Sequence, residues 1–138
     1  MRELEIPNKN ILILDDPNCM RPLKDRIETH NSWNVYLTNH IFEAKEKIKT
    51  GVDLLIYEPF LYAMPEGEKM FDLIHETKSK KIPIYACSTQ TLIQLNEQRF
   101  RMGDEFDYFS LKPFLLKNIE KEIEKILMNN IKVIYHLD

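Results

Sequence analysis

The sequence contains few of the residues that several common protein classes require. Only 2 of its 138 residues are cysteine, which is too few for a disulfide framework, and the two do not have the spacing of a zinc site. There are 3 glycines, and the sequence has neither a Gly-x-Gly-x-x-Gly segment nor a Gly-Lys-Ser/Thr phosphate loop. These absences exclude a small disulfide-rich protein and speak against the common glycine-rich nucleotide sites.

Long hydrophobic runs and an excess of positive charge are also missing. No apolar segment approaches the roughly 18 residues that cross a bilayer, and residues 1–9 are charged and interrupted by proline, unlike a signal peptide. The 19 Lys and Arg against 22 Asp and Glu give a net charge of −3, which argues against direct nucleic-acid binding. We therefore expect a reduced, cytoplasmic protein that binds neither membranes nor nucleic acid directly.

What the sequence does contain is a regular alternation of short apolar runs and segments with helical periodicity. Hydrophobic residues make up 43% of the chain, which is ordinary for a folded domain. The apolar runs predict five strands, and the first of them stops abruptly at a pair of aspartates. The predicted strands are residues 11–14, 33–37, 53–57, 82–86 and 108–111.

The segments between these runs have apolar residues three or four positions apart and predict helices. The second of them ends at Gly51, a plausible C-terminal glycine. The last is the clearest, with Ile119 and Ile123 on its apolar stripe and charged residues such as Glu120 between the stripe positions. Strands that alternate with helices at this period predict a doubly wound α/β domain with a five-stranded parallel sheet.

The predicted domain covers residues 1–128 and is followed by an extra apolar segment, residues 129–138. We interpret this segment as a C-terminal tail or a sixth strand. Its apolar run at 131–135 is a candidate surface for homodimer formation.

The polar residues that follow the strands are the candidates for function, because ligands of doubly wound sheets bind at the carboxyl ends of the strands. Clustered carboxylates repel one another and need a cation beside them, and an all-oxygen ligand set suits Mg²⁺. A lysine and a hydroxyl would suit a phosphoryl oxygen. The residues are Asp15 and Asp16 after the first strand, Glu58 after the third, Ser88 after the fourth and Lys112 after the fifth.

In this order the motifs resemble the receiver domain of bacterial two-component response regulators. They are Ile-Leu-Ile-Leu-Asp15-Asp16, Asp53-Leu-Leu-Ile-Tyr-Glu58 with Met64-Pro65-Glu66-Gly67, Pro83-Ile-Tyr-Ala-Cys-Ser88 and Lys112-Pro113-Phe114. The resemblance spans residues 10–127 and implies a flavodoxin-like topology with a histidine kinase or another signalling protein as partner. It also implies Mg²⁺ held by Asp15, Asp16 and Glu58, and switch and phosphoryl-contact roles for Ser88, Phe109 and Lys112.

Glu58 departs from the family, in which an aspartate at the end of the third strand accepts the phosphoryl group. Glutamate is longer by one methylene, about 1.5 Å, and in-line transfer is sensitive to displacements of this size. We therefore expect Glu58 not to be phosphorylated in the usual way and to imitate the charge of a phosphorylated aspartate.

These residues are compatible with three functions. The first is an atypical receiver that acts through protein-protein interaction and is not an enzyme. The second is a functional phosphoacceptor that uses Mg²⁺ and a histidine kinase partner. The third, a small phosphate-handling enzyme on the same topology, is disfavoured because the glycine-rich motifs are missing and no histidine follows a predicted strand.

Overall fold

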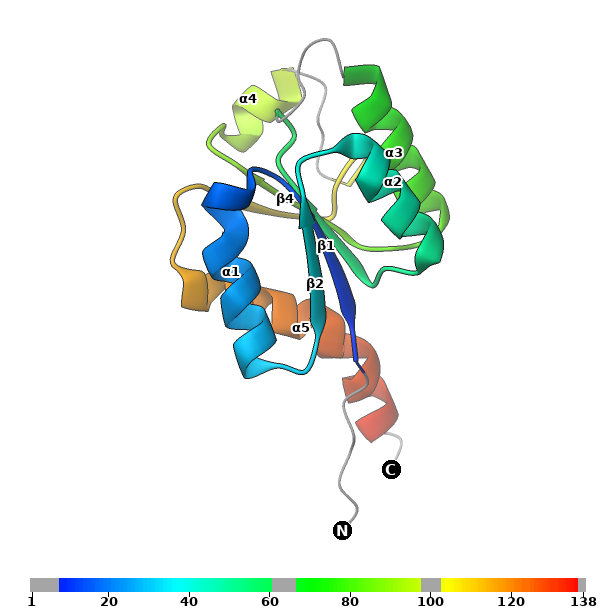
Figure 1. Ribbon diagram of the computed structural model, residues 1–138, viewed down its shortest axis with the longest axis vertical. Coiled ribbons are helices and arrows are strands. Elements are labelled where there is room, and N and C mark those ends of the chain that lie inside the picture. Colours follow the sequence, from blue (N-terminus) through cyan, green and yellow to red (C-terminus); the bar gives the residue numbers. More distant parts are fainter. Residues whose placement is uncertain (1–7, 61–66, 98–102, 137–138) are drawn as a thin grey trace.

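Strands and helices alternate in the computed structural model, which describes residues 8–60, 67–97 and 103–136 (Figure 1). The strands are β1 (Asn10–Leu14), β2 (Asn34–Thr38), β3 (Leu54–Tyr57), β4 (Ile84–Ser88) and β5 (Tyr108–Leu111). The helices are α1 (Pro17–His30), α2 (Ile41–Thr50), α3 (Gly67–Ser79), α4 (Leu92–Glu97) and α5 (Leu116–His136). Over this described part of the chain, no helix is both long and apolar enough to cross a membrane.

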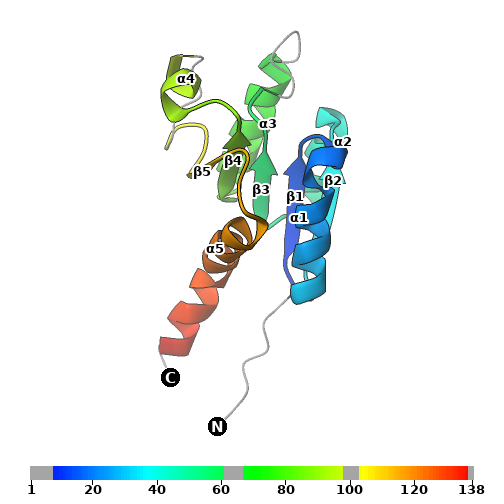
Figure 2. The same ribbon diagram turned by 90° about the vertical axis from the view of Figure 1, so that its left-hand side faces the viewer.

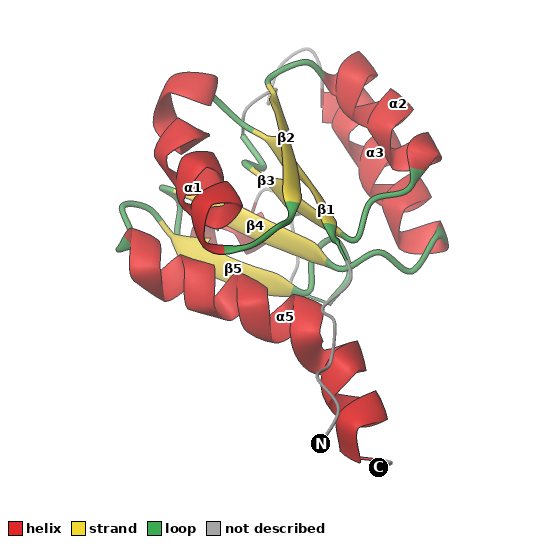
Figure 3. Cartoon of the chain, turned by 60° about the horizontal axis from the view of Figure 1, so that its bottom comes forward, coloured by secondary structure: helices red, strands yellow, loops and turns green. Residues whose placement is uncertain are grey.

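The strands form a 5-stranded parallel sheet in the order β2-β1-β3-β4-β5, which confirms the predicted fold class (Figure 3). The chain first moves from β1 outward to β2 and then crosses back to β3 on the other side of β1. The strand order therefore reverses between β1 and β3, and the carboxyl ends of these two strands flank the point at which such sheets bind ligands.

Helices cover both faces of the sheet because alternate residues of each strand point to opposite sides. Leu12 and Leu14 of β1 belong to the core under α2, α3 and α4, and Ile11 and Ile13 belong to the core under α1 and α5. Figure 1 shows α1 and α5 on one side of the strands and α2 and α3 on the other. Burial on both faces explains why the inner strands are continuous apolar runs rather than alternating ones.

Two strands lie one or two residues later than the sequence predicts. The fourth was expected at 82–86 but spans Ile84–Ser88, because the N–H of Ile82 donates to the carbonyl of Thr77 (3.3 Å) and closes the end of α3. Ser88 is therefore the last residue of β4 rather than the residue after it. The second strand begins at Asn34 and not at Trp33, although Trp33 is buried.

Of the two interpretations of residues 129–138, a tail or a sixth strand, the strand does not form over residues 129–136, because α5 continues to His136. Its backbone carries residues 131–136 past the end of the sheet (Figure 2). By contrast, Gly51 ends α2 with a φ of 107°, as expected from its place after the helical segment. Homodimer formation through residues 131–135 stays a prediction.

Candidate functional site

The carboxyl ends of β1 and β3 bring two of the predicted acidic residues to one edge of the sheet. Asp15 follows β1 and is 2% exposed, and its N–H donates to the carbonyl of Thr38 at the end of β2 (3.0 Å). Glu58 follows β3, and its N–H donates to the carbonyl of Leu14 (3.1 Å). These bonds continue the parallel ladder beyond the strands and hold both side chains beside the switch point.

Lys112 reaches both carboxylates from the end of β5. Its N–H donates to the carbonyl of Ser88 (2.7 Å), and its peptide bond to Pro113 is cis. The Lys112 ammonium lies 2.6 Å from Asp15 Oδ2 and 3.2 Å from Glu58 Oε1. Because the side chains of Lys112, Asp15 and Glu58 are only 11%, 3% and 13% exposed, this ion pair is largely shielded from water. We call these three residues the Lys112 cluster.

The electrostatics of the Lys112 cluster favour the charged lysine. Burial alone would lower the pKa of the Lys112 ammonium, but the hydrogen bond and charge of Asp15 and the charge of Glu58 outweigh burial and raise it. One ammonium faces two carboxylates, so the three side chains together carry a single negative charge. Lys112 therefore stays protonated and neutralises part of the acidic site.

Asp16 lies next to the cluster but serves the adjacent helix. Its side chain is exposed, and Oδ1 accepts a hydrogen bond from the N–H of Asn18 (2.9 Å), which makes Asp16 the N-cap of α1 with Pro17 as the first helical residue. Its own N–H donates to Asp15 Oδ1 (2.6 Å). The structure thus gives Asp15 and Asp16 different roles that the paired sequence did not distinguish.

Ser88 and Phe109 complete the set of predicted residues. Ser88 is fully buried at the end of β4, and its hydroxyl oxygen accepts a hydrogen bond from the N–H of Gln90 (3.0 Å). Phe109 is partly buried on β5 against the core under α2 and α3, with its ring centroid 6.2 Å from that of Phe106. Ser88 thus lies beside Lys112 through a backbone hydrogen bond, and Phe109 packs against the core from β5. Their switch and phosphoryl-contact roles stay predictions.

The acidic residues do not fit a divalent cation in their present arrangement. Within residues 8–60, 67–97 and 103–136, no group of three histidine, cysteine, aspartate or glutamate side chains is placed to hold a metal ion. The donor chemistry is right for Mg²⁺, but the Lys112 ammonium lies against Asp15 and Glu58. The carboxylate of Asp16 caps α1. Mg²⁺ binding by Asp15, Asp16 and Glu58 therefore stays a prediction from the resemblance.

A second ionic cluster, between α1 and α5, was missed by the sequence analysis. Glu120 is 5% exposed, although its place between stripe positions predicts a solvated side chain. Its Oε1 accepts from Arg26 Nε and its Oε2 pairs with His30 Nδ1, both at 2.6 Å. The spacing of Arg26 and His30 by four residues places both on one face of α1 and was the available signal. We call these residues the Glu120 cluster.

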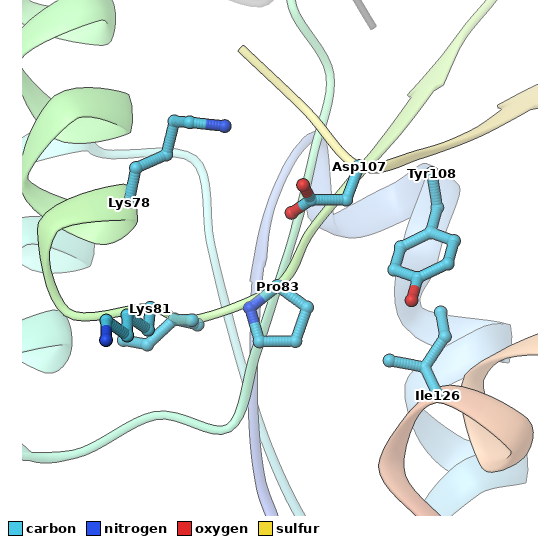
Figure 4. Close-up of a pocket in the computed structure, with 7 residues that line it drawn as sticks. Lys78, Lys81, Pro83, Asp107, Tyr108 and Ile126 are labelled. Carbon is cyan, nitrogen blue, oxygen red and sulfur yellow. The ribbon is translucent and has the colours of Figure 1, made fainter. Parts of the chain in front are cut away.

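A separate pocket of about 430 Å³ lies at the opposite end of the sheet from the Lys112 cluster (Figure 4). Pro83 and Asp107, which precede β4 and β5, form its floor, and the carboxylate of Asp107 accepts a hydrogen bond from the N–H of Ile84 (2.9 Å). Lys78 lines one side and Ile126 of α5 the other. The pocket is therefore distinct from the strand-end site, at the amino ends of the strands.

Of the comparisons with known proteins, the one with solved structures found similar proteins. No protein-family model matches the sequence, and no curated protein matches it. A CheY-like response regulator receiver domain protein from Methanospirillum hungatei aligns with a TM-score of 0.71 at 17% identity, covering 91% of this chain and 98% of that one. The non-phosphorylated HemR receiver domain from Leptospira biflexa aligns with a TM-score of 0.66 at 27% identity, covering 88% and 94%.

A third similar structure is the receiver domain of a sensor histidine kinase from Pseudomonas aeruginosa, with a magnesium ion coordinated in its active-site cleft. It aligns with a TM-score of 0.64 at 14% identity and covers 88% of this chain and 98% of that one. All three are single receiver domains of about the length of this chain. Together with the parallel strand order, these alignments show that the chain has the flavodoxin-like fold of response regulator receiver domains.

Proposed function

We propose that this protein is an atypical receiver that takes part in two-component signalling by binding another protein, without phosphorylation at the usual position and without enzymatic turnover. The observation that carries the proposal is the contact of Glu58 Oε1 with the Lys112 ammonium at 3.2 Å. This contact pairs the Glu58 carboxylate, which follows β3, with the Lys112 ammonium, which follows β5. An aspartate at the same position would carry the same charge one methylene, about 1.5 Å, further back.

Both oxygens of Glu58 already have partners, which supports the absence of phosphoryl transfer. Oε1 faces Lys112, and Oε2 accepts a hydrogen bond from the N–H of Phe60 (3.2 Å). A nucleophilic carboxylate oxygen has to approach the phosphorus in line and at close range. The extra methylene of Glu58 and its two bonds hold the carboxylate in another position.

The exposed apolar residues near β5 supply a surface for a partner. Leu92 and Ile93 on α4 are 43% and 74% exposed, and Leu111 and Leu115 around the end of β5 are 47% and 64% exposed. Leu111 and Leu115 line a shared depression with Phe114. Exposed apolar groups of this kind favour contact with another protein. The partner is a cytoplasmic signalling protein, a histidine kinase or a second copy of this chain.

The proposal is tested by intact mass after incubation with acetyl phosphate and Mg²⁺. We expect the wild type to stay unmodified and Glu58→Asp to gain the mass of one phosphoryl group, because aspartate restores the shorter reach. Glu46→Asp, the same change on the exposed face of α2, is the matched control and should stay unmodified.

A phosphorylated wild type would overturn the proposal and make the protein a functional phosphoacceptor. If neither the wild type nor Glu58→Asp gains mass, the extra methylene of Glu58 is not what prevents phosphorylation. The rest of the site would then also have lost its phosphoryl chemistry.

A further inference from the structure

We propose that Lys112 is itself the cation of the strand-end site, so that the wild-type chain does not take up Mg²⁺ there and removal of the ammonium opens a divalent-cation site between Asp15 and Glu58. This inference deepens the proposed function and rests on it. It states that an amine of the chain itself occupies the position of a metal ion and keeps the metal ion out.

The position of the ammonium is the first argument. It contacts Asp15 at 2.6 Å and Glu58 at 3.2 Å, in surroundings where the three side chains are between 3% and 13% exposed. Mg²⁺ binds carboxylate oxygens at about 2.0–2.1 Å in a nearly octahedral shell and keeps several waters. A metal ion bridging these two carboxylates would have to occupy the space of the lysine amine.

The remaining carboxylate oxygens are the second argument, because most of them already accept hydrogen bonds from the backbone. Asp15 Oδ1 accepts from the N–H of Asp16 (2.6 Å), and Glu58 Oε2 accepts from the N–H of Phe60 (3.2 Å). Asp16 Oδ1 accepts from the N–H of Asn18 (2.9 Å). These bonds orient the carboxylates toward the backbone or the ammonium and away from a common metal position.

Charge is the third argument. The wild-type cluster has a single net negative charge, and a divalent cation entering it would lie a few ångströms from an ammonium. Replacing Lys112 by methionine removes the ammonium, keeps a flexible apolar side chain that is one atom shorter, and leaves two largely shielded carboxylates unneutralised. Such a pair favours a divalent cation, since burial makes unpaired like charges costly.

Glu58 is expected to control the same equilibrium. Its extra methylene, about 1.5 Å in length, brings the carboxylate to the ammonium at the end of β5. Glu58→Asp should draw that carboxylate back, weaken its contact with Lys112 and allow a cation to enter while the lysine is still present.

The experiment is a titration with MnCl₂ followed by electron paramagnetic resonance of the free ion, repeated with MgCl₂ by calorimetry. We expect Lys112→Met to bind at least about ten-fold more tightly than the wild type, because repulsion between a monovalent and a divalent cation a few ångströms apart exceeds this factor even in water. Lys117→Met removes an exposed lysine from the first turn of α5 and should bind like the wild type.

Equal affinity of the wild type and Lys112→Met would overturn the inference. If Lys112→Met does not fold, Glu58→Asp decides the question, because it should bind Mn²⁺ more tightly than the wild type. A Glu58→Asp variant that binds no better would contradict the role of the Glu58 contact with Lys112. Failure here is distinct from failure of the proposed function, since a wild type that binds Mn²⁺ can still stay unmodified by acetyl phosphate.

Discussion

The two ionic clusters of this protein have opposite arrangements of acidic and basic side chains. In the Lys112 cluster one cation contacts two carboxylates, whose side chains are 3% and 13% exposed. In the Glu120 cluster one carboxylate, on a side chain that is 7% exposed, contacts an arginine and a histidine, and the side chains of Arg26 and His30 are 36% and 47% exposed. The number of contacts is the same, but the groups left behind when the central residue is removed differ in their access to water.

We interpret the Lys112 cluster as a candidate site and the Glu120 cluster as a clamp between α1 and α5. Arg26 and His30 can be hydrated without Glu120, which serves to join α1 to α5. The side chains of Asp15 and Glu58 are only 3% and 13% exposed, so these two carboxylates have less access to water and depend more on the Lys112 ammonium. The need for a counter-charge resides at the switch point of the sheet, where ligands of this fold class bind.

The largest predicted effect is on stability. In buffer with EDTA, Lys112→Met should lower the free energy of unfolding by about 3–5 kcal/mol, as for other buried pairs that lose one partner. Glu120→Gln should cost only about 1–2 kcal/mol, because its partners regain water and the amide still hydrogen-bonds. Urea denaturation measures both. Equal costs would break the distinction between site and clamp, and Lys121→Met, an exposed change on α5, is the control.

The second prediction concerns pH. Burial raises the pKa of Glu120, but Arg26 and His30 outweigh it and hold the pKa below the ordinary value of 4.5. Its folded pKa is depressed, so its contribution is present above pH 4.5 and is lost as pH falls through the folded pKa. The cost of Glu120→Gln should therefore shrink in acid. A cost that stays constant from pH 7 to pH 3 would contradict this account.

The Lys112 cluster has the opposite sign. The pKa of Lys112 is raised, so its contribution is complete below the ordinary value of 10.5 and is lost as pH rises through the folded pKa. The cost of Lys112→Met should therefore stay level around neutral pH and shrink above pH 10.5. Urea denaturation at a series of pH values, for the wild type and both variants, should show the cost of Glu120→Gln shrinking in acid and the cost of Lys112→Met shrinking in alkali.

The smallest predicted effect concerns a buried polar atom that belongs to neither cluster. Tyr57 is the last residue of β3, and among the described residues its hydroxyl has no hydrogen-bond partner. Tyr57→Phe should raise the free energy of unfolding by about 1 kcal/mol, because an unsatisfied buried hydroxyl is costly. This corresponds to a melting temperature higher by about 3 °C in a scanning calorimeter.

Tyr85 on β4 provides the matched control, since its hydroxyl pairs with that of Ser110. Tyr85→Phe should lower stability by about 1 kcal/mol through loss of this bond. A destabilised Tyr57→Phe would mean that the Tyr57 hydroxyl is satisfied after all, and the contrast between paired and unpaired buried groups would have to be revised.

Much of the fold was predictable because it depends on local pattern. The apolar runs that end in Asp15 and Glu58 and the stripe containing Ile119 and Ile123 are properties of short segments, and they were enough for the parallel sheet and its helices. The end of α3 was not predictable, because the turn that moves the start of β4 to Ile84 depends on hydrogen bonds back to the helix. The sixth strand failed for a related reason, since an apolar run of that length suits a helix equally well.

The sequence by itself determined which chemical groups stand at the strand ends, because each strand stops where its apolar run stops. The resemblance to receiver domains also predicts that Glu58 stands at the phosphoacceptor position. Only the tertiary structure decided that Lys112 bridges Asp15 and Glu58, and that Glu120 is buried between two helices. The physical reason is that these choices depend on the reach of side chains from elements up to 97 positions apart, which no local pattern contains.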